Sequence, residues 1–234
     1  MEYNFAERKL LVCDLSLIKY QTAWEIQKKY FEARSHEKIK DIIFICEHPH
    51  TYTLGKVADK KNLLLDDKML KEKNIDVFEI DRGGDITYHG PGQIVGYPII
   101  NLANWKKDTH LYLRALEEVL MLTCIDYGLI PSRIEKYTGV WIEDRKICAI
   151  GIKVSRWITM HGFAFNVNTD LSNFDGIIPC GISDKEVTSL SREIVRQFDI
   201  NEVKQKILKN FEQVFSYTQI ENISNEELEN SVKN

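Results

Sequence analysis

The stretch RGGDITYHGPGQ, which runs from Arg82 to Gln93, lies between two apolar runs at residues 75–80 and 97–102. Both runs have the composition of strands, so the stretch between them is predicted to be a loop held close to a sheet. Glycine permits positive φ and close approach of a ligand to the backbone. Paired glycines beside Arg82 and His89 therefore favour a ligand-binding loop, although a tight hairpin with incidental polar residues explains the same local pattern.

The composition is that of a globular protein. The chain has 234 residues, of which 44% are hydrophobic and 28% charged, enough for one large domain with a sizeable core. Its formal net charge of −4 lacks the basic excess that is typical of nucleic-acid-binding domains. The sequence has neither an apolar run of about 18 residues nor the pattern of a secretion signal at its start, so we expect a cytoplasmic protein with no membrane partner.

The cysteines and histidines do not form a metal-binding pattern. Five cysteines without a CxxC pair argue against a disulfide framework and against a structural zinc site. No HExxH spacing occurs, and the glycines match neither the P-loop nor GxGxxG, so neither a metal nor a nucleotide cofactor is expected. Four cysteines lie inside apolar strand or helix patterns and are predicted to be core residues: Cys13, Cys46, Cys124 and Cys148.

Hydrophobic periodicity predicts a mixture of strands and helices. Strands are expected at residues 9–15, 41–46, 75–80, 139–142, 146–154 and 159–167. Helices are expected near residues 17–31, 66–73 and 108–127, and from Asp199 or Asn201 onward. Because the order lacks a regular βαβ alternation, it favours an α+β fold with a mixed β-sheet core and flanking helices on one side. Residues 1–219 are predicted to form a single domain, and residues 220–234, rich in Asn, Glu and Ser, to be a frayed tail.

Cys180 is the cysteine whose setting best suits chemistry. Pro179 restricts the backbone before it, and Gly181 leaves the sulfur and the nearby amides open, as an exposed nucleophile requires. The alternative for a lone cysteine is a small buried hydrophobe. His89 and His161, each followed by glycine, are either hydrogen-bonded structural residues or the partner in a Cys–His dyad.

Lys146 opens a strand that is otherwise apolar through Ile152. It is either an edge charge in water or a charge that faces a site. In the second case its ammonium group would lower the pKa of a facing Cys180 thiol. Lys153 competes for this role, but their odd separation puts the two lysines on opposite faces of a regular strand unless a bulge intervenes.

Five blocks of sequence, taken together and in order, resemble those of a known family. They are EHP with YTLG at residues 47–55, RGGDITYHGPGQ with YP at residues 82–98, RK with AIG at residues 145–151, HGFA with N at residues 161–166, and PCGI at residues 179–182. With these blocks the chain is similar to the octanoyl-acyl carrier protein:protein N-octanoyltransferases, the LipB family. The resemblance implies a fold like the catalytic domain of biotin and lipoate protein ligases, which agrees with the α+β prediction.

The resemblance also implies a reaction and its partners. An octanoyl group would pass from octanoyl-acyl carrier protein to a lysine of lipoyl domains, those of 2-oxoacid dehydrogenase complexes and the glycine cleavage H protein. Neither ATP nor a metal would be needed, because the thioester already carries the activated acyl group. The product would be the first intermediate of endogenous lipoate synthesis.

The family's functional residues correspond to named positions of this chain. Cys180 corresponds to the acyl-thioester nucleophile and Lys146 to the lysine that lowers its pKa and moves protons. The amide of Cys180 or Gly181 is a candidate donor to the oxyanion, and His161 is a supporting residue. The acyl-binding walls correspond to Arg82, Gly83, Gly84, Asp85, Ile86, Thr87, Tyr88 and His89, to Ala149, Ile150 and Gly151, and to Gly162, Phe163 and Ala164.

Two alternatives predict different behaviour. An ATP-dependent lipoate or biotin ligase of the same fold would activate a free acid as an adenylate and would need no cysteine, but the PCGI and HGPGQ segments argue against it. A binding module for acyl carrier protein or a lipoyl domain would form a stable complex and leave the acceptor's mass unchanged.

Overall fold

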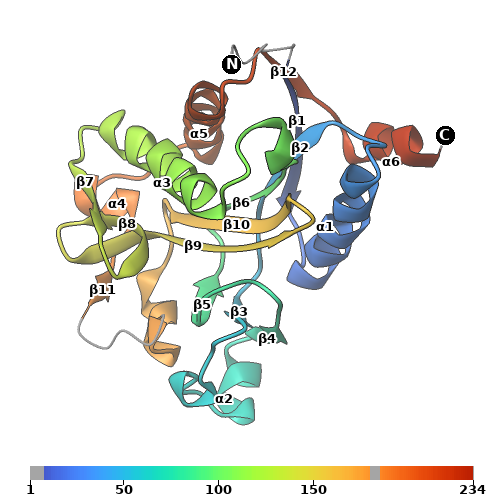
Figure 1. The fold of residues 1–234 in the computed structure, drawn as a ribbon. Coiled ribbons are helices and arrows are strands. Elements are labelled where there is room, and N and C mark those ends of the chain that lie inside the picture. Colours follow the sequence, from blue (N-terminus) through green and yellow to red (C-terminus); the bar gives the residue numbers. More distant parts are fainter. Residues whose placement is uncertain (1–7, 180–184, 234) are drawn as a thin grey trace.

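The computed structural model describes residues 8–179 and 185–233 of the chain. These residues form a nine-stranded sheet in the order β12-β1-β2-β6-β10-β9-β8-β7, with β11 paired to β9, and a three-stranded sheet in the order β4-β3-β5 (Figure 1). The strands are β1 (Lys9–Leu17), β2 (Asp41–Glu47), β3 (Thr51–Leu54), β4 (Asp76–Glu79), β5 (Ile86–His89), β6 (Gln93–Ile99), β7 (Pro131–Ile134), β8 (Tyr137–Ile142), β9 (Arg145–Ser155), β10 (Ile158–Asn166), β11 (Glu186–Val187) and β12 (Gln219–Asn222).

The large sheet is mixed, and this confirms the predicted fold class. β1 runs parallel to both of its neighbours, β2 and β12. The pairs from β2 through β6, β10, β9 and β8 to β7 are all antiparallel. Every residue of the central strands β6 and β10 is buried, because other layers cover both of their faces.

Helices cover both faces of the large sheet (Figure 1), so the prediction that they lie on one side is wrong. Leu116 of α3 and Phe211 of α5 share a core with Leu10 of β1. Phe31 of α1 shares the opposite core with Leu11, the next residue along β1. Strands that are apolar on both faces require cover on both. The helices are α1 (Tyr20–Ser35), α2 (Asp67–Glu72), α3 (Thr109–Ile125), α4 (Leu190–Ile194), α5 (Ile200–Phe215) and α6 (Asn225–Lys233), with 3₁₀ turns η1 (Lys60–Asn62), η2 (Leu102–Asn104) and η3 (Leu171–Gly176).

Aspartate side chains begin the two long helices of the first face at the predicted residues. The Asp108 carboxylate accepts a hydrogen bond from the Leu111 amide at 3.0 Å, and the Asp199 carboxylate accepts one from the Asn201 amide at 2.9 Å. Each bond satisfies an amide at the helix start that has no partner within the helix. The sequence therefore located the starts of α3 and α5 correctly.

The region between β2 and β6 holds more strand than predicted. Residues 47–55, where no strand was expected, contain β3, and the glycine-rich stretch, expected to be a loop, contains β5. β3 pairs with β4 on one side and with β5 on the other, which creates the small sheet. Ile86 and Tyr88 alternate with Thr87 and His89, a strand pattern that the flanking glycines and proline concealed.

The end of the chain is ordered where fraying was expected. β12 pairs with β1 and extends the large sheet, and Leu228 of α6 is fully buried in the core beneath α1. The expectation of a frayed tail is therefore wrong for residues 220–233, since a few apolar side chains among the polar ones are enough to anchor them. Among the described residues, no helix has the length and hydrophobicity needed to cross a membrane.

Candidate active site

A cavity opens between the α1 face of the large sheet and the small sheet. The centre of a water-sized molecule can occupy about 50 Å³ of it, and all the empty space between its lining atoms, open solvent at the mouth included, is about 470 Å³. Most of the predicted acyl-binding walls line it, together with His161 and three residues that the sequence did not indicate, Tyr20, Val95 and Tyr97. The predicted lining residues are Arg82, Gly84, Asp85, Thr87, His89, Ala149, Ile150, Gly151, Gly162, Phe163 and Ala164.

The floor of the cavity is built from small residues in register on neighbouring strands. Ala149 of β9 pairs with Ala164 of β10, and Gly151 pairs with Gly162. Ala164 in turn pairs with Val95 of β6, where the side chains become larger. Paired residues of an antiparallel sheet project from the same face, so Ala149 and Ala164 form a trench across two strands. Gly151 and Gly162 instead allow close packing, since a Cβ there would lie 2.8 Å from Arg82 Cδ and 2.2 Å from the Gly96 carbonyl oxygen, respectively.

Four predicted wall residues direct their side chains elsewhere. Phe163 and Ile150 pack into the core beneath α3 and α5, on the opposite face of the sheet, so only their backbone can line the cavity. Ile86 and Tyr88 belong to a separate core in the small sheet and do not line the cavity. The correction follows from strand geometry, because successive side chains point to opposite faces.

Arg82 braces the glycine-rich segment from within the small sheet. Its Nη2 donates to the Thr53 carbonyl at 2.7 Å and to the Thr53 hydroxyl at 3.0 Å, and its Nη1 donates to the Gly83 carbonyl at 3.0 Å. A Cβ on Gly55 would lie 2.1 Å from the Gly84 carbonyl oxygen, so this close approach of two backbone segments requires glycine. Gly55 thus allows the glycine-rich segment to pack against the end of β3.

A chain of buried hydrogen bonds leads from the cavity wall to the strand after residue 184. His89 accepts from the Thr53 hydroxyl at 3.2 Å through Nε2 and donates through Nδ1 to the Gln93 side chain at 3.0 Å. Gln93 donates to Asn166 at 2.9 Å, and Asn166 donates to the Thr188 carbonyl at 2.9 Å. Burial lowers the pKa of His89 well below its ordinary value, so His89 is a neutral structural residue in this chain of bonds.

His161 is hydrogen-bonded to the carboxylate of Asp81. Its Nε2 donates to Asp81 at 2.8 Å, and Asp81 also receives Lys153 at 2.5 Å. These hydrogen bonds, His161's first, hold the pKa of Asp81 below its usual range, while burial lowers the pKa of His161 despite the nearby carboxylate. Lys153, the competing lysine, is therefore committed to an ion pair at the side of the cavity.

A β-bulge decides the direction of Lys146. Val140 pairs with Cys148 but Trp141 pairs with Lys146, which leaves Ile147 as an extra residue on β9. Since Val140 and Trp141 point to opposite faces, Lys146 shares a face with Ala149, on the cavity side. The spacing of Lys146 and Lys153 predicts that they lie on opposite faces unless a bulge intervenes. This bulge puts them on the same face.

Lys146 is buried, and the alternative of an edge charge in water is therefore wrong. Its side chain is only 6% exposed, and its Nζ lies 4.8 Å from the centre of the Trp141 ring. Lys146 lines a groove that shares Gly84, Asp85 and Gly151 with the cavity. The groove and the cavity therefore adjoin along these residues.

Cys180 and Gly181 lie outside the described residues, but the segments on either side of them are fixed. Before them, the Ile178 amide donates to the Asn62 carbonyl at 2.8 Å, and the Asn62 side chain donates to Asp85 in the cavity wall at 2.6 Å. After them, β11 pairs with β9, and the Thr188 amide donates to the Lys146 carbonyl at 2.9 Å. Both flanking segments are thus attached to the junction of groove and cavity.

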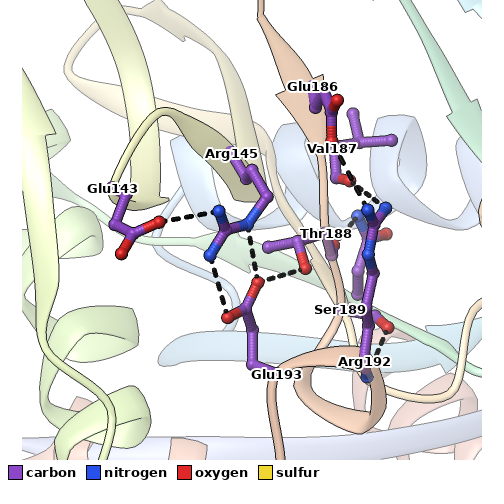
Figure 2. Close-up of polar contacts among 9 residues, drawn as sticks. Glu143, Arg145, Glu186, Val187, Thr188, Ser189, Arg192 and Glu193 are labelled. Atoms are coloured by element: carbon purple, nitrogen blue, oxygen red, sulfur yellow. Dashed lines mark hydrogen bonds and ion pairs between the residues drawn. The ribbon is translucent and has the colours of Figure 1, made fainter.

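Figure 2 shows the polar cluster that fastens this second segment. Glu193 receives two hydrogen bonds from Arg145, at 3.0 and 3.2 Å, and a third from the Thr188 hydroxyl at 2.5 Å. Arg145 also donates to Glu143 at 2.7 Å. The cluster links Arg145, the residue before Lys146, to the segment around β11 and α4. No sequence pattern indicated it, because its members lie in four separate elements or turns.

The four cysteines predicted to be core residues are fully buried. Burial raises the pKa of each thiol, to about 11 for Cys13 and about 12 for Cys124. Such thiols are protonated and shielded, as expected of structural cysteines. Within the described parts of the chain, no group of three or more potential ligands could hold a metal ion.

Sequence reasoning missed several residues of the site. Gln93 and Asn166 occur in the motif blocks that carry the resemblance, but nothing in a linear pattern reveals that they bond to each other. Asp81 directly precedes Arg82, and its charge beside the glycine-rich stretch was the sequence feature that could have indicated it as a site residue. Tyr20 lies 62 positions before Arg82 in the chain, so only the packing of α1 reveals its place in the cavity.

The chain is similar to known proteins over most of its length. The profile of the lipoyl protein ligase A/B catalytic domain matches residues 19–212. An octanoyltransferase of Flavobacterium johnsoniae is 50% identical over 89% of this chain and 97% of its own, and one of Christiangramia forsetii is 48% identical over 89% and 96%.

Solved structures share the fold at low sequence identity. A lipoate-protein ligase A bound with ATP superposes with a TM-score of 0.72 at 18% identity, over 97% of this chain and 93% of its own. A bipartite lipoate protein ligase from Thermoplasma acidophilum, solved with its E2 lipoyl domain, gives 0.70 at 18% identity over 97% and 91%. With its sheet, its cavity and relatives of nearly half-identical sequence, the chain belongs to the octanoyltransferase family, built on the lipoyl protein ligase A/B catalytic domain.

Proposed function

We propose that this octanoyltransferase is a cytoplasmic enzyme that moves an octanoyl group from octanoyl-acyl carrier protein to the lysine of lipoyl domains, through a thioester on Cys180. The acceptors are the lipoyl domains of 2-oxoacid dehydrogenase complexes and the glycine cleavage H protein. One observation carries the proposal: a cavity floored by small residues adjoins the groove of a buried lysine, where both segments flanking Cys180 are attached. The choice of octanoyl as the transferred group rests on the relatives, which are named octanoyltransferases.

The chemistry divides into two acyl transfers. Lys146 takes the thiol proton of Cys180, and the thiolate attacks the donor thioester. The carbon–sulfur bond to the carrier breaks, and the carrier's thiolate leaves with the proton that Lys146 took from Cys180. The neutral amine of the acceptor lysine then attacks the Cys180 thioester, an amide forms, and the sulfur of Cys180 departs while Lys146 accepts a proton from the amine. Each step conserves the activation of the acyl group, so neither ATP nor a metal is required.

The walls give the acyl chain an apolar path. Ala149 and Ala164, which pair across β9 and β10, leave the trench open because their side chains are small. An amide of Cys180 or Gly181 is the proposed donor to the oxyanion, where a fixed N–H group is worth several kcal/mol, about 3 in known cases. Arg82 holds the roof of the trench through Thr53, which keeps the loop from closing onto the chain.

Mass spectrometry after incubation with octanoyl-carrier protein tests the intermediate. The wild type should gain about 126 Da, the mass of an octanoyl group less the displaced hydrogen, on the peptide that holds Cys180. Cys180→Ala should give neither adduct nor product, whereas Cys148→Ala, a core change on the Lys146 strand, should keep the adduct at Cys180. An adduct on another residue would refute the intermediate.

The role of Lys146 is tested by comparison with Lys153. Lys146→Ala should lower transfer by about 10²–10⁴-fold, the usual contribution of a general acid–base group, and Lys153→Ala by much less. Circular dichroism should show both variants folded. Equal losses in the two variants would contradict the assignment, and octanoylation from free octanoate with ATP but no thioester donor would favour a ligase.

A further inference from the structure

The cavity ends at a wall of aromatic residues, and its length is set by the sheet. Its floor crosses β9, β10 and β6. Neighbouring strands lie about 4.8 Å apart, so the floor is roughly 9.6 Å from the first strand to the third. An extended octanoyl chain, with seven carbon–carbon bonds that each advance it by about 1.25 Å, measures roughly 9 Å from carbonyl carbon to methyl group. The two lengths agree to within one bond.

The two ends of the cavity can be told apart. Gly84, Asp85, Ile150 and Gly151 line both the cavity and the groove that contains Lys146, so they mark the thioester end. Among the residues that line the cavity but not the groove, Val95 and Tyr97 come from β6, the floor strand farthest from β9 and Lys146, and Tyr20 comes from α1. The methyl end of a chain bound from the Lys146 side would therefore meet these three side chains.

Tyr20 is held too firmly to give way. Tyr20 is only 3% exposed, and its ring stacks on Phe78 and His89, with centroid distances of 5.3 and 5.7 Å. It also forms a T-shaped pair with His48 at a centroid distance of 5.2 Å. Such aromatic contacts fix both position and orientation. Tyr20 is the first residue of α1, so the helix also holds its backbone in place.

His48 also holds Tyr97 in place. His48 shares a hydrogen bond of 2.7 Å with the Tyr97 hydroxyl and another of 2.7 Å with the Ile18 carbonyl, just before α1. The two tyrosines therefore share one support. A wall of interlocked rings resists displacement, because packed interiors tolerate little added volume.

We propose that Tyr20, backed by Tyr97 and Val95, is the stop that fixes the length of the transferred acyl chain at about eight carbons. The proposal rests on the proposed function, since it assumes that an acyl thioester enters from the Lys146 side. Tyr20 acts as a specificity-determining residue: it contacts the end of the chain and takes no part in the bond changes. Tyr97 and Val95 complete the surface that the methyl group meets.

Competition between carrier proteins loaded with hexanoyl, octanoyl, decanoyl and dodecanoyl groups tests the stop. The wild type should prefer octanoyl, and each added methylene should lower kcat/KM by about tenfold or more. Tyr20→Ala should shift the optimum to decanoyl or dodecanoyl, with a change of at least about tenfold in the decanoyl-to-octanoyl ratio. Tyr20→Phe, which keeps the ring, should keep the octanoyl optimum.

A matched variant distinguishes the loss of the Tyr20 stop from a general loss of stability. Tyr30→Ala removes an equally buried tyrosine from the same helix but outside the cavity, and it should keep the octanoyl optimum. Val95→Phe fills the far end and should shift the optimum to hexanoyl, so it decides the matter if Tyr20→Ala does not fold. An octanoyl optimum in both Tyr20→Ala and Val95→Phe would overturn the inference, whereas a wild type that transfers no acyl group would overturn the proposed function instead.

Discussion

Two glutamates bind the same arginine, and they test directly how burial changes the contribution of an ion pair to the free energy of unfolding. Arg145 bonds to Glu193, whose side chain is 12% exposed, and to Glu143, whose side chain is 75% exposed. Glu193 also receives the Thr188 hydroxyl. Glu193→Ala and Glu143→Ala thus remove the same chemical group from the same partner in two different solvent environments.

The structure supplies the expected magnitudes. Each charge-assisted hydrogen bond contributes about 1.5–3 kcal/mol, but Arg145 keeps Glu143 and some water after Glu193 is removed. We therefore expect Glu193→Ala to lower the free energy of unfolding by about 2 kcal/mol rather than by the sum of three bonds. For a domain of this size that corresponds to about 4–8 °C in Tm. Glu143→Ala, an exposed pair, should cost no more than about 0.5 kcal/mol.

The effect should depend on pH in one direction. Burial would raise the pKa of Glu193, but the hydrogen bonds from Arg145 and Thr188 outweigh it, so the net shift is downward. A carboxylate with a lowered folded-state pKa stabilises the protein above its unfolded-state pKa, near 4.3, and loses this contribution as the pH falls. The difference between wild type and Glu193→Ala should therefore be largest at neutral pH and shrink below about pH 4.

Urea unfolding of wild type, both single variants and the Arg145→Ala double variants measures these terms. The double-mutant cycle should give a coupling of about 1–2 kcal/mol for Arg145 with Glu193 and almost none for Arg145 with Glu143. Octanoyl transfer should fall in Glu193→Ala, because the cluster adjoins the Lys146 backbone through Thr188. Equal costs for the two glutamates would refute the argument that burial gives this pair its strength.

Two further predictions concern the support of the cavity. Burial lowers the pKa of His48 to about 4, below its unfolded value, so the unfolded state binds a proton first and stability should fall by about 2 kcal/mol from pH 7 to pH 5. His48→Gln should remove this part of the slope in unfolding experiments at the two pH values, and an unchanged slope would count against it. Gly55→Ala should lower the stability by about 1–3 kcal/mol, because its Cβ would strike the Gly84 carbonyl. Gly83→Ala, whose Cβ would meet only an ordinary contact at 3.4 Å, should change Tm much less, and similar Tm values for the two variants would contradict the contact.

Local signals in the sequence located much of the fold. The starts of α3 and α5 followed from Asp108 and Asp199, because a cap needs only a side chain and the amides two or three residues on. The buried cysteines followed from the apolar strands and helices around them. β5 was missed, because an isolated strand of four residues is stable only when β3 pairs with it.

The resemblance in the motif blocks identified the cavity walls as segments but not as side chains. Ile86, Tyr88, Ile150 and Phe163 belong to those segments, yet their side chains point away from the cavity. A motif records which residues occur together, whereas the direction of a side chain depends on which face of its strand is turned toward the ligand. That face is set by the strands and helices that pack on the sheet.

The sequence by itself determined the chain's family, the mixture of strands and helices, and the pairing of Cys180 with Lys146 as the candidate chemistry. Only the tertiary structure decided that Lys146 is buried on the cavity side, since the bulge at Ile147 exists only through the pairing of β8 with β9. It also decided that Lys153 pairs with Asp81 and that Tyr20 lines the cavity. Residue type and spacing act over a few positions, whereas register, burial and the choice of partner arise from contacts between segments that are far apart in the chain.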